Sequence, residues 1–162
     1  MKKLIPVVII AVMFHLFIPS SALGLSNPEN LKGIKSIGLV IEGLPPEATN
    51  FGLLKKTLQT DVELKLRLLG IYDNSSLGYL YLNVNLLADT HSVSGNVSVT
   101  VRQFAMLETS AQIAMVTIWG VAEVFTAKKS SAESMIRKIV KDSVDEFLND
   151  YLEANPRKTP SN

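Results

Sequence analysis

Apolar and polar residues alternate along the chain with two different periods, which divide it into predicted strands and helices. Residues 79–87 alternate leucine and valine with tyrosine and asparagine, as expected of a strand with one buried face. Residues 49–69 repeat leucine and valine at three- and four-residue spacing, as expected of a helix with one apolar stripe. The predicted elements are a strand over 34–44, a helix over 49–69, strands over 79–87, 97–102 and 112–125, and a last helix from Ser130 up to Asn155.

Turn-forming and capping residues mark where these elements begin and end. Asp89–Asn96 is predicted to be a polar loop, and Ser130–Glu133 has the pattern of a capping box at the start of the last helix. The alternation of the third predicted strand falters at Phe104 and Met106, which indicates a bulge or a strand end, and Gly120 marks a second candidate bulge. Because short turns join the last three strands, we expect them to be antiparallel neighbours.

The order of the predicted elements, β-α-β-β-β-α, favours the α+β class. Each helix carries a single apolar stripe and the sheet has one strongly apolar face. We therefore expect a two-layer sandwich, with a four-stranded, mainly antiparallel sheet and two helices on one face. In this interpretation residues 34–155 form a single α+β domain, preceded by an irregular lead-in over 25–33 and followed by a disordered tail over 156–162.

The first 24 residues differ from the rest of the chain in composition. They hold two lysines at the start, an apolar stretch over 4–18 and small residues up to Gly24, but none of the 15 acidic residues. This layout is typical of a secretory signal peptide, cut after Ala22 or Gly24. Its apolar stretch is shorter than the roughly 20 residues that span a bilayer. With the absence of cysteine, it predicts a periplasmic bacterial protein that has no transmembrane span once the signal peptide is removed.

Composition and charge exclude several classes of function. A net charge of +1 gives no electrostatic attraction to nucleic acid, and the lack of cysteine excludes disulfides, Cys-ligated zinc, iron–sulfur clusters and a lipid-modified cysteine anchor. His91 is the single histidine after the signal peptide. Since neighbouring side chains of an extended loop point apart, Asp89 and His91 predict neither a catalytic triad nor a metal site. We expect no enzyme activity, no metal and no cofactor.

The polar face of the best-defined predicted strand carries the candidate partner-binding residues. Tyr79, Tyr81 and Asn83 follow one another at period two, and Arg102 on the next strand extends the patch. Tyrosine offers a large contact area with a hydrogen-bonding tip, which suits a protein partner, a peptide strand or a glycan. It is also a common residue of exposed strands. Trp119, assigned to the less apolar face of its strand, either anchors a ligand or covers the centre of the sheet.

Three segments, together with the element order and the signal peptide, resemble known envelope proteins. They are Glu63–Ile71, Val116–Trp119 and Val144–Leu152, the last followed by Asn155 and Pro156. The chain resembles small exported bacterial proteins of uncharacterised function. Its layout is similar to the two-helix, four-stranded module in the amino-terminal domain of the periplasmic Tol-complex propeller protein and in the outer-membrane lipopolysaccharide-assembly lipoprotein. The resemblance covers about residues 34–155. It implies an envelope binding or scaffolding module without a catalytic residue, and this chain lacks the cysteine that anchors the lipoproteins.

These observations favour a non-enzymatic periplasmic binding or assembly module that acts in the bacterial cell envelope through an exposed sheet face or edge. The alternative is a carrier that holds a lipid or small apolar ligand between helices and sheet, because the first helix is rich in leucine. The expected partner is an envelope protein or a lipid-related molecule. The sequence leaves the oligomeric state open.

Overall fold

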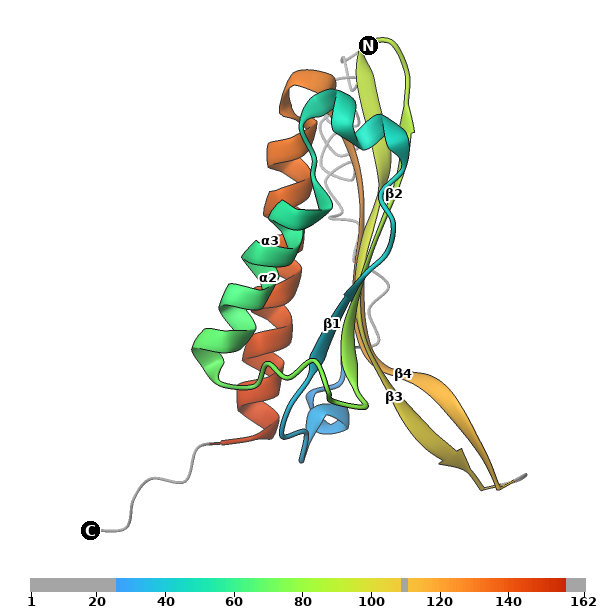
Figure 1. Ribbon diagram of the computed structural model, residues 1–162, viewed down its shortest axis with the longest axis vertical. Helices are drawn as coiled ribbons and strands as arrows, with labels where there is room; N and C mark the ends of the chain where they lie inside the picture. The colour runs from blue at the N-terminus through green and yellow to red at the C-terminus, as the bar shows by residue number, and fades with distance from the viewer. Residues whose placement is uncertain (1–25, 109–110, 157–162) are drawn as a thin grey trace, which may run out of the picture.

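Two helices cover one face of a four-stranded sheet in the computed structural model, which describes residues 26–108 and 111–156 (Figure 1). The predicted α+β class and its two layers are confirmed. The predicted signal peptide and the tail from residue 157 lie outside the described residues. The elements are η1 (Pro28–Leu31), β1 (Gly38–Ile41), η2 (Pro46–Phe51), α2 (Lys55–Leu69), β2 (Tyr79–Ala88), β3 (Ser92–Leu107), β4 (Gln112–Lys128) and α3 (Lys129–Ala154), where η is a 3₁₀ helix.

The strands lie in the order β1-β2-β3-β4. β1 runs parallel to β2, with Gly38 opposite Tyr79 and Ile41 opposite Leu82, whereas β2, β3 and β4 are antiparallel neighbours. A parallel pair needs a crossover connection, and α2 provides it on the covered face. The sheet is therefore mainly antiparallel, as predicted.

One apolar core fills the space between the two layers. In β2 the alternation predicted from the sequence is confirmed, because Leu80, Leu82 and Val84 are buried against the helices and the residues between them are not. The core takes its largest side chains from all the main elements: Leu80 and Leu82 of β2, Val99 and Val101 of β3, Trp119 of β4, Leu58 and Leu66 of α2, and Ile136 and Phe147 of α3. Full burial of such an aliphatic side chain contributes about 1.5–3 kcal/mol.

The lead-in before β1 is attached to the end of α3. Leu31 in η1 is fully buried. Asn155 follows α3 directly, and its side-chain amide donates to the carbonyl oxygen of Leu31 over 2.9 Å while its Oδ1 accepts from the backbone nitrogen of Gly33 over 2.8 Å. The side-chain amide of Asn30 donates to the carbonyl oxygen of Ile118 in β4 over 2.8 Å. η1 thus covers part of the free edge of β4.

The first strand and the first helix are both shorter than predicted. β1 includes only Gly38–Ile41 of the expected strand 34–44. Residues 49–51 belong to the 3₁₀ helix η2, which ends where Gly52 adopts a left-handed conformation, and α2 begins only at Lys55. The Thr49 hydroxyl donates to the carbonyl oxygen of Pro46 instead of capping α2.

The prediction of a polar loop over residues 89–96 is wrong for the second half of this range. Asp89 folds the chain back within three residues, because its Oδ1 accepts from the backbone nitrogens of His91 and Ser92, each over 2.7 Å. β3 therefore begins at Ser92. Its polar residues that follow occupy the uncovered face of a strand, where the hydroxyl of Ser94 bonds that of Thr126.

The irregularity between β3 and β4 lies at neither predicted position. Val101 pairs with Trp119 and Arg102 with Thr117, so Ile118 is the extra residue of a bulge in β4. The predicted capping box is also wrong. α3 begins at Lys129, directly after β4, and no side chain caps it. Ser130–Glu133 therefore already lies within the first turns of the helix.

Candidate partner-binding surface

Four of the five predicted partner-binding residues lie together on the sheet face that carries no helix, here called the outer face. Tyr79, Tyr81 and Asn83 alternate with the buried residues of β2, so they point away from the helices. Arg102 of β3 is paired directly with Tyr79. The structure of β2 thus confirms that Tyr79, Tyr81 and Asn83 share one face, as the period-two pattern predicts. The pairing of β3 with β2 brings Arg102 to the same face.

Tyr81 lies at the centre of a small polar and aromatic group. The guanidinium of Arg102 lies over the Tyr81 ring, 3.7 Å from its centroid, and the Tyr81 hydroxyl donates to the carboxylate of Glu42 beyond the end of β1. The ring of Tyr79 lies 6.3 Å from that of Tyr81, tilted by 55°. We call Glu42, Tyr79, Tyr81 and Arg102 the Tyr–Arg cluster.

The Tyr–Arg cluster favours the neutral form of the Tyr81 phenol. The hydrogen bond to Glu42, together with partial desolvation and the negative charge of Glu42, raises the pKa of Tyr81 above its ordinary value. The cation–π contact with Arg102 contributes about 0.5–1 kcal/mol at a surface of this kind. These contacts hold the Tyr81 ring and the Arg102 guanidinium against each other.

Two polar atoms beside this cluster have no hydrogen-bond partner among the described residues. They are Nε of Arg102 and the hydroxyl oxygen of Thr100, and both are shielded from solvent. Leaving a buried donor unpaired costs about 1–3 kcal/mol.

Trp119, the fifth predicted residue, does not lie on the outer face, and its assignment to the less apolar face is wrong. It is fully buried on the covered face, where its indole nitrogen donates to Oδ2 of Asp150 over 2.7 Å and its ring meets Phe147 edge-on. The bulge at Ile118 reverses the alternation, so Met115 and Thr117 lie on the outer face while Trp119 points inward. Counting from Met115 without the bulge gives the wrong side.

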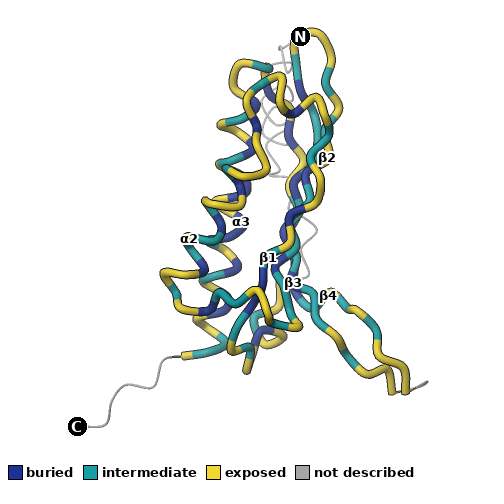
Figure 2. Tube along the Cα trace, viewed as in Figure 1, coloured by how far each residue is buried: buried dark blue, intermediate teal, exposed yellow. Residues whose placement is uncertain are grey.

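Beyond the Tyr–Arg cluster, β3 and β4 continue without β2 as a two-stranded arm that projects from the body of the molecule (Figures 1 and 2). The arm comprises residues 103–107 and 112–116. Phe104 pairs with Met115 and Met106 with Ile113, so these four side chains share the outer face of the arm. All four are exposed, Met106 by 69% and Ile113 by 70%. We call them the apolar stripe.

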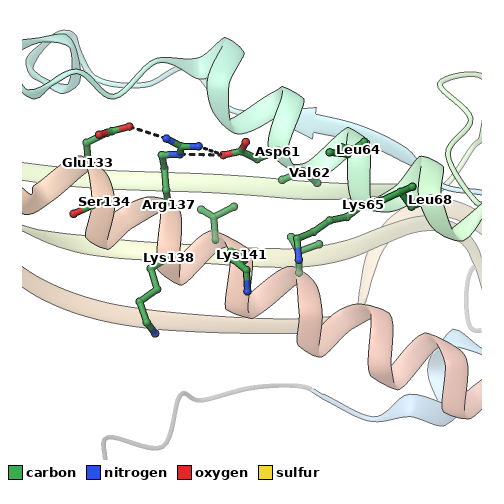
Figure 3. A pocket seen from close by; sticks show the side chains of 12 residues that line it. Asp61, Val62, Leu64, Lys65, Leu68, Glu133, Ser134, Arg137, Lys138 and Lys141 are labelled. Carbon is green, nitrogen blue, oxygen red and sulfur yellow. Dashed lines mark hydrogen bonds and ion pairs between the residues drawn. The ribbon is translucent and has the colours of Figure 1, made fainter.

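A cleft of about 480 Å³ lies between α2 and α3 (Figure 3). Val62 of α2 and Val140 and Val144 of α3 line it at depth, and the exposed Leu64 and Leu68 form one wall. Its position differs from the predicted ligand site, because the space between helices and sheet is filled by the core. The cleft is instead a gap between the two helices.

Ion pairs join the two helices along this cleft. Arg137 of α3 contacts Asp61 of α2 over 2.9 Å, and Lys65 of α2 contacts Asp145 of α3. Partial burial alone would raise the pKa of Asp145, but hydrogen bonds from Lys65 and Lys141 outweigh it and lower the pKa. Since each of these cations has an acidic partner, the ion pairs along the cleft attract a charged ligand only weakly. The cleft therefore suits an apolar group.

The described residues include no group of three or more histidine, aspartate or glutamate side chains arranged to hold a metal ion. His91 lies in the turn between β2 and β3, and its backbone contacts Asp89 and Lys129. Within the same residues no helix is both long and apolar enough to cross a bilayer.

No family model and no curated protein matches the chain. Among solved structures, the chain is similar to a PelC variant from Paraburkholderia phytofirmans described as a dodecamer, with 10% identity, a TM-score of 0.40, and coverage of 72% of this chain and 87% of that one. It is also similar to a minor lipoprotein from Acinetobacter baumannii, with 13% identity, a TM-score of 0.37, and coverage of 80% and 99%. The resemblance to the Tol-complex and lipopolysaccharide-assembly proteins stays a prediction.

Proposed function

We propose that this protein is a non-enzymatic binding module of the bacterial cell envelope, which holds a partner protein on its outer face at the Tyr–Arg cluster. The observation that carries the proposal is the stacking of Arg102 on Tyr81 together with the bond from Tyr81 to Glu42. Tyrosine and arginine are the residue types that most often dominate the energy of protein interfaces. Here they are already held in one conformation, which lowers the entropic cost of binding.

The proposed location rests on the first 24 residues. Their basic start, apolar stretch and small residues favour export, and the absence of cysteine argues against a lipid-modified cysteine as the anchor. We therefore place the mature protein in the periplasm, where the outer face is accessible to other envelope proteins.

In-cell crosslinking tests this function. The double variant Tyr81→Ala, Arg102→Ala should lose the protein that crosslinks to the outer face of the wild type, since both main contact side chains are removed. Val124→Ala is the matched control, because Val124 is 82% exposed on the outer face of β4 but distant in register from the cluster. If the double variant retains every crosslinked protein, the proposal is wrong.

A second candidate function is the transport or storage of a small apolar ligand in the cleft between α2 and α3. The cleft is within the size range of ligand sites and its depth is lined by valine side chains. Native mass spectrometry of protein purified from its own envelope should then show a bound apolar molecule. Leu68→Glu should abolish it, whereas Leu77→Glu, at an equally exposed leucine in the loop before β2, should not. A wild type without added mass would exclude this candidate.

A further inference from the structure

We propose that the apolar stripe of the arm packs against the same stripe of a second copy of this chain, so that the protein forms a two-fold dimer through its arms. The inference is independent of the Tyr–Arg cluster. It starts from four large apolar side chains, Phe104, Met106, Ile113 and Met115, that are exposed together on one face of a projecting ribbon.

The arm has little support from its own chain. β2 pairs with β3 only as far as Arg102, and among the described residues η1 covers the free edge of β4 only near Ile118, at the base of the arm. An isolated two-stranded ribbon is at best marginally stable in water, and it needs further strands or a packed face. The arm nevertheless keeps regular pairing from Gln103 to Leu107. A surface that covers the apolar stripe would supply the missing packing.

The charge of the arm identifies the occupant. Between residues 103 and 117 the only charged side chain is that of Glu108, which directly follows β3. An anionic membrane surface would require lysine or arginine along the stripe, and the arginine next to it, Arg102 at the base of the arm, is stacked on Tyr81. A strongly charged protein partner would likewise require opposite charges here. A neutral apolar stripe is complementary to itself, and a two-fold contact places one patch against its own copy.

The remainder of the molecule permits this association. The whole chain has a net charge of +1, so two copies repel each other weakly. On the reverse face of the arm the small side chains of the paired Ala105 and Ala114 lie between Leu107, which is 40% exposed, and Val116, so the large apolar surface there is interrupted. Two ribbons packed on their outer faces would lie about 10 Å apart, as stacked sheets do.

Sedimentation equilibrium of the mature protein tests the dimer. At up to about 100 µM the wild type should be mainly dimeric, and Met106→Ser, Ile113→Ser should raise the dissociation constant by about tenfold or more. Val124→Ser is the control, because it removes an equally exposed apolar side chain of β4 outside the arm and should leave the dimer unchanged. A wild type that is monomeric at this concentration would overturn the inference.

Single cysteines locate the contact, since the natural chain has none. Met106→Cys lies on the apolar stripe, and Ala105→Cys is its neighbour on the opposite face of the same strand. A short bismaleimide reagent should link two copies of the first variant and not two copies of the second. Equal crosslinking of both would contradict the stripe-to-stripe contact, even if the double serine variant failed to fold.

The outcome is distinguishable from a failure of the proposed function. If the variant Met106→Ser, Ile113→Ser loses the dimer but still captures the envelope protein through Tyr81 and Arg102, both proposals are supported. A monomeric wild type that still captures this partner overturns only the dimer, whereas a dimer that captures no envelope protein overturns only the proposed function.

Discussion

Tyr81 and Trp119 are large aromatic residues of the same sheet with opposite surroundings. Tyr81 lies on the outer face, where Arg102 and Glu42 hold it at the surface. Trp119 is fully buried and its indole nitrogen donates to Asp150 of α3, so it connects the sheet to the helix. Residue type left a binding role open for both, and for Trp119 it also left open a packing role at the centre of the sheet, which its burial in the core confirms.

Replacing Trp119 by phenylalanine should destabilise the protein. The variant keeps an aromatic ring against Phe147 but removes the hydrogen bond to the carboxylate of Asp150. Hydrogen bonds to charged groups contribute about 1.5–3 kcal/mol, and we expect a loss of that size in the free energy of unfolding, measured with urea and far-UV circular dichroism. Asp150→Asn, which retains an acceptor, should cost less. Equal stability of Trp119→Phe and wild type would contradict this role.

Asp89 should make stability depend on pH in the acid range. Hydrogen bonds from Ser92 and His91 lower its pKa from 3.8 to about 2. Because the pKa is lower in the folded state, the stabilisation is complete above the unfolded value and is lost as the pH falls from about 4 to about 2. The difference in melting temperature between wild type and Asp89→Ala should therefore shrink over this interval. A difference that stays constant from pH 6 to pH 2 would refute the assignment.

At the scale of elements, β3 and β4 depart from the predicted structure in their lengths and in their register. The side chain of Asp89 starts β3 five residues early, and the bulge at Ile118 reverses the faces of β4. Both strands then extend past β2 to form the arm. The irregular alternation at Phe104 and Met106 was the sequence signal of this arm, although it indicates apolar residues exposed on a ribbon and not a bulge.

Gly95 is a position of β3 where the close approach of β2 requires glycine. An added Cβ would lie 2.1 Å from the carbonyl oxygen of Asn85, so one of the two strands would have to move. Gly95→Ala should lower the free energy of unfolding by about 1–3 kcal/mol, as overpacking does. Gly43→Ala is the control, because its Cβ would meet no atom within 4 Å. Similar unfolding midpoints for the two variants would refute the role of this contact.

At the scale of the whole molecule, one core joins both layers and the lead-in. Leu31 of η1, the inner residues of the sheet and the apolar faces of α2 and α3 belong to the same buried cluster. Asn155 closes this arrangement by binding the lead-in to the end of α3. The arm contributes no residue to this buried cluster.

The single core should make unfolding cooperative. Trp119 lies between β4 and α3 and is the only tryptophan, so its fluorescence reports the separation of the two layers. Urea transitions followed by this fluorescence and by far-UV circular dichroism should coincide, as for a two-state domain. Transitions with separate midpoints would show that helices and sheet unfold independently.

Export should remove the first part of the chain. Intact mass measurement of protein from the bacterial periplasm should show a mature chain that begins at Leu23 or Leu25, according to the cut after Ala22 or Gly24. A chain that retains Met1 would contradict the predicted cleavage.

The sequence by itself determined the class of the fold, the approximate elements and the shared face of Tyr79, Tyr81 and Asn83. It did so because the period of apolar residues records which side of a helix or strand meets a core. The predicted ends of helices and strands were less accurate. Thr49 and Ser130 are residue types that often cap helices, but Thr49 lies within η2 and Ser130 within α3.

Only the tertiary structure decided where Trp119 points and where the bulge lies. It also decided that β3 and β4 extend beyond the end of β2, and that the cleft lies between α2 and α3. These features depend on the length and register of a partner element, which lies far away in the sequence. A shift of one residue in register moves a side chain to the other face, and local periodicity cannot record it. The Tyr–Arg cluster shows both levels, because the period of β2 placed Tyr81 and strand pairing brought Arg102 onto its ring.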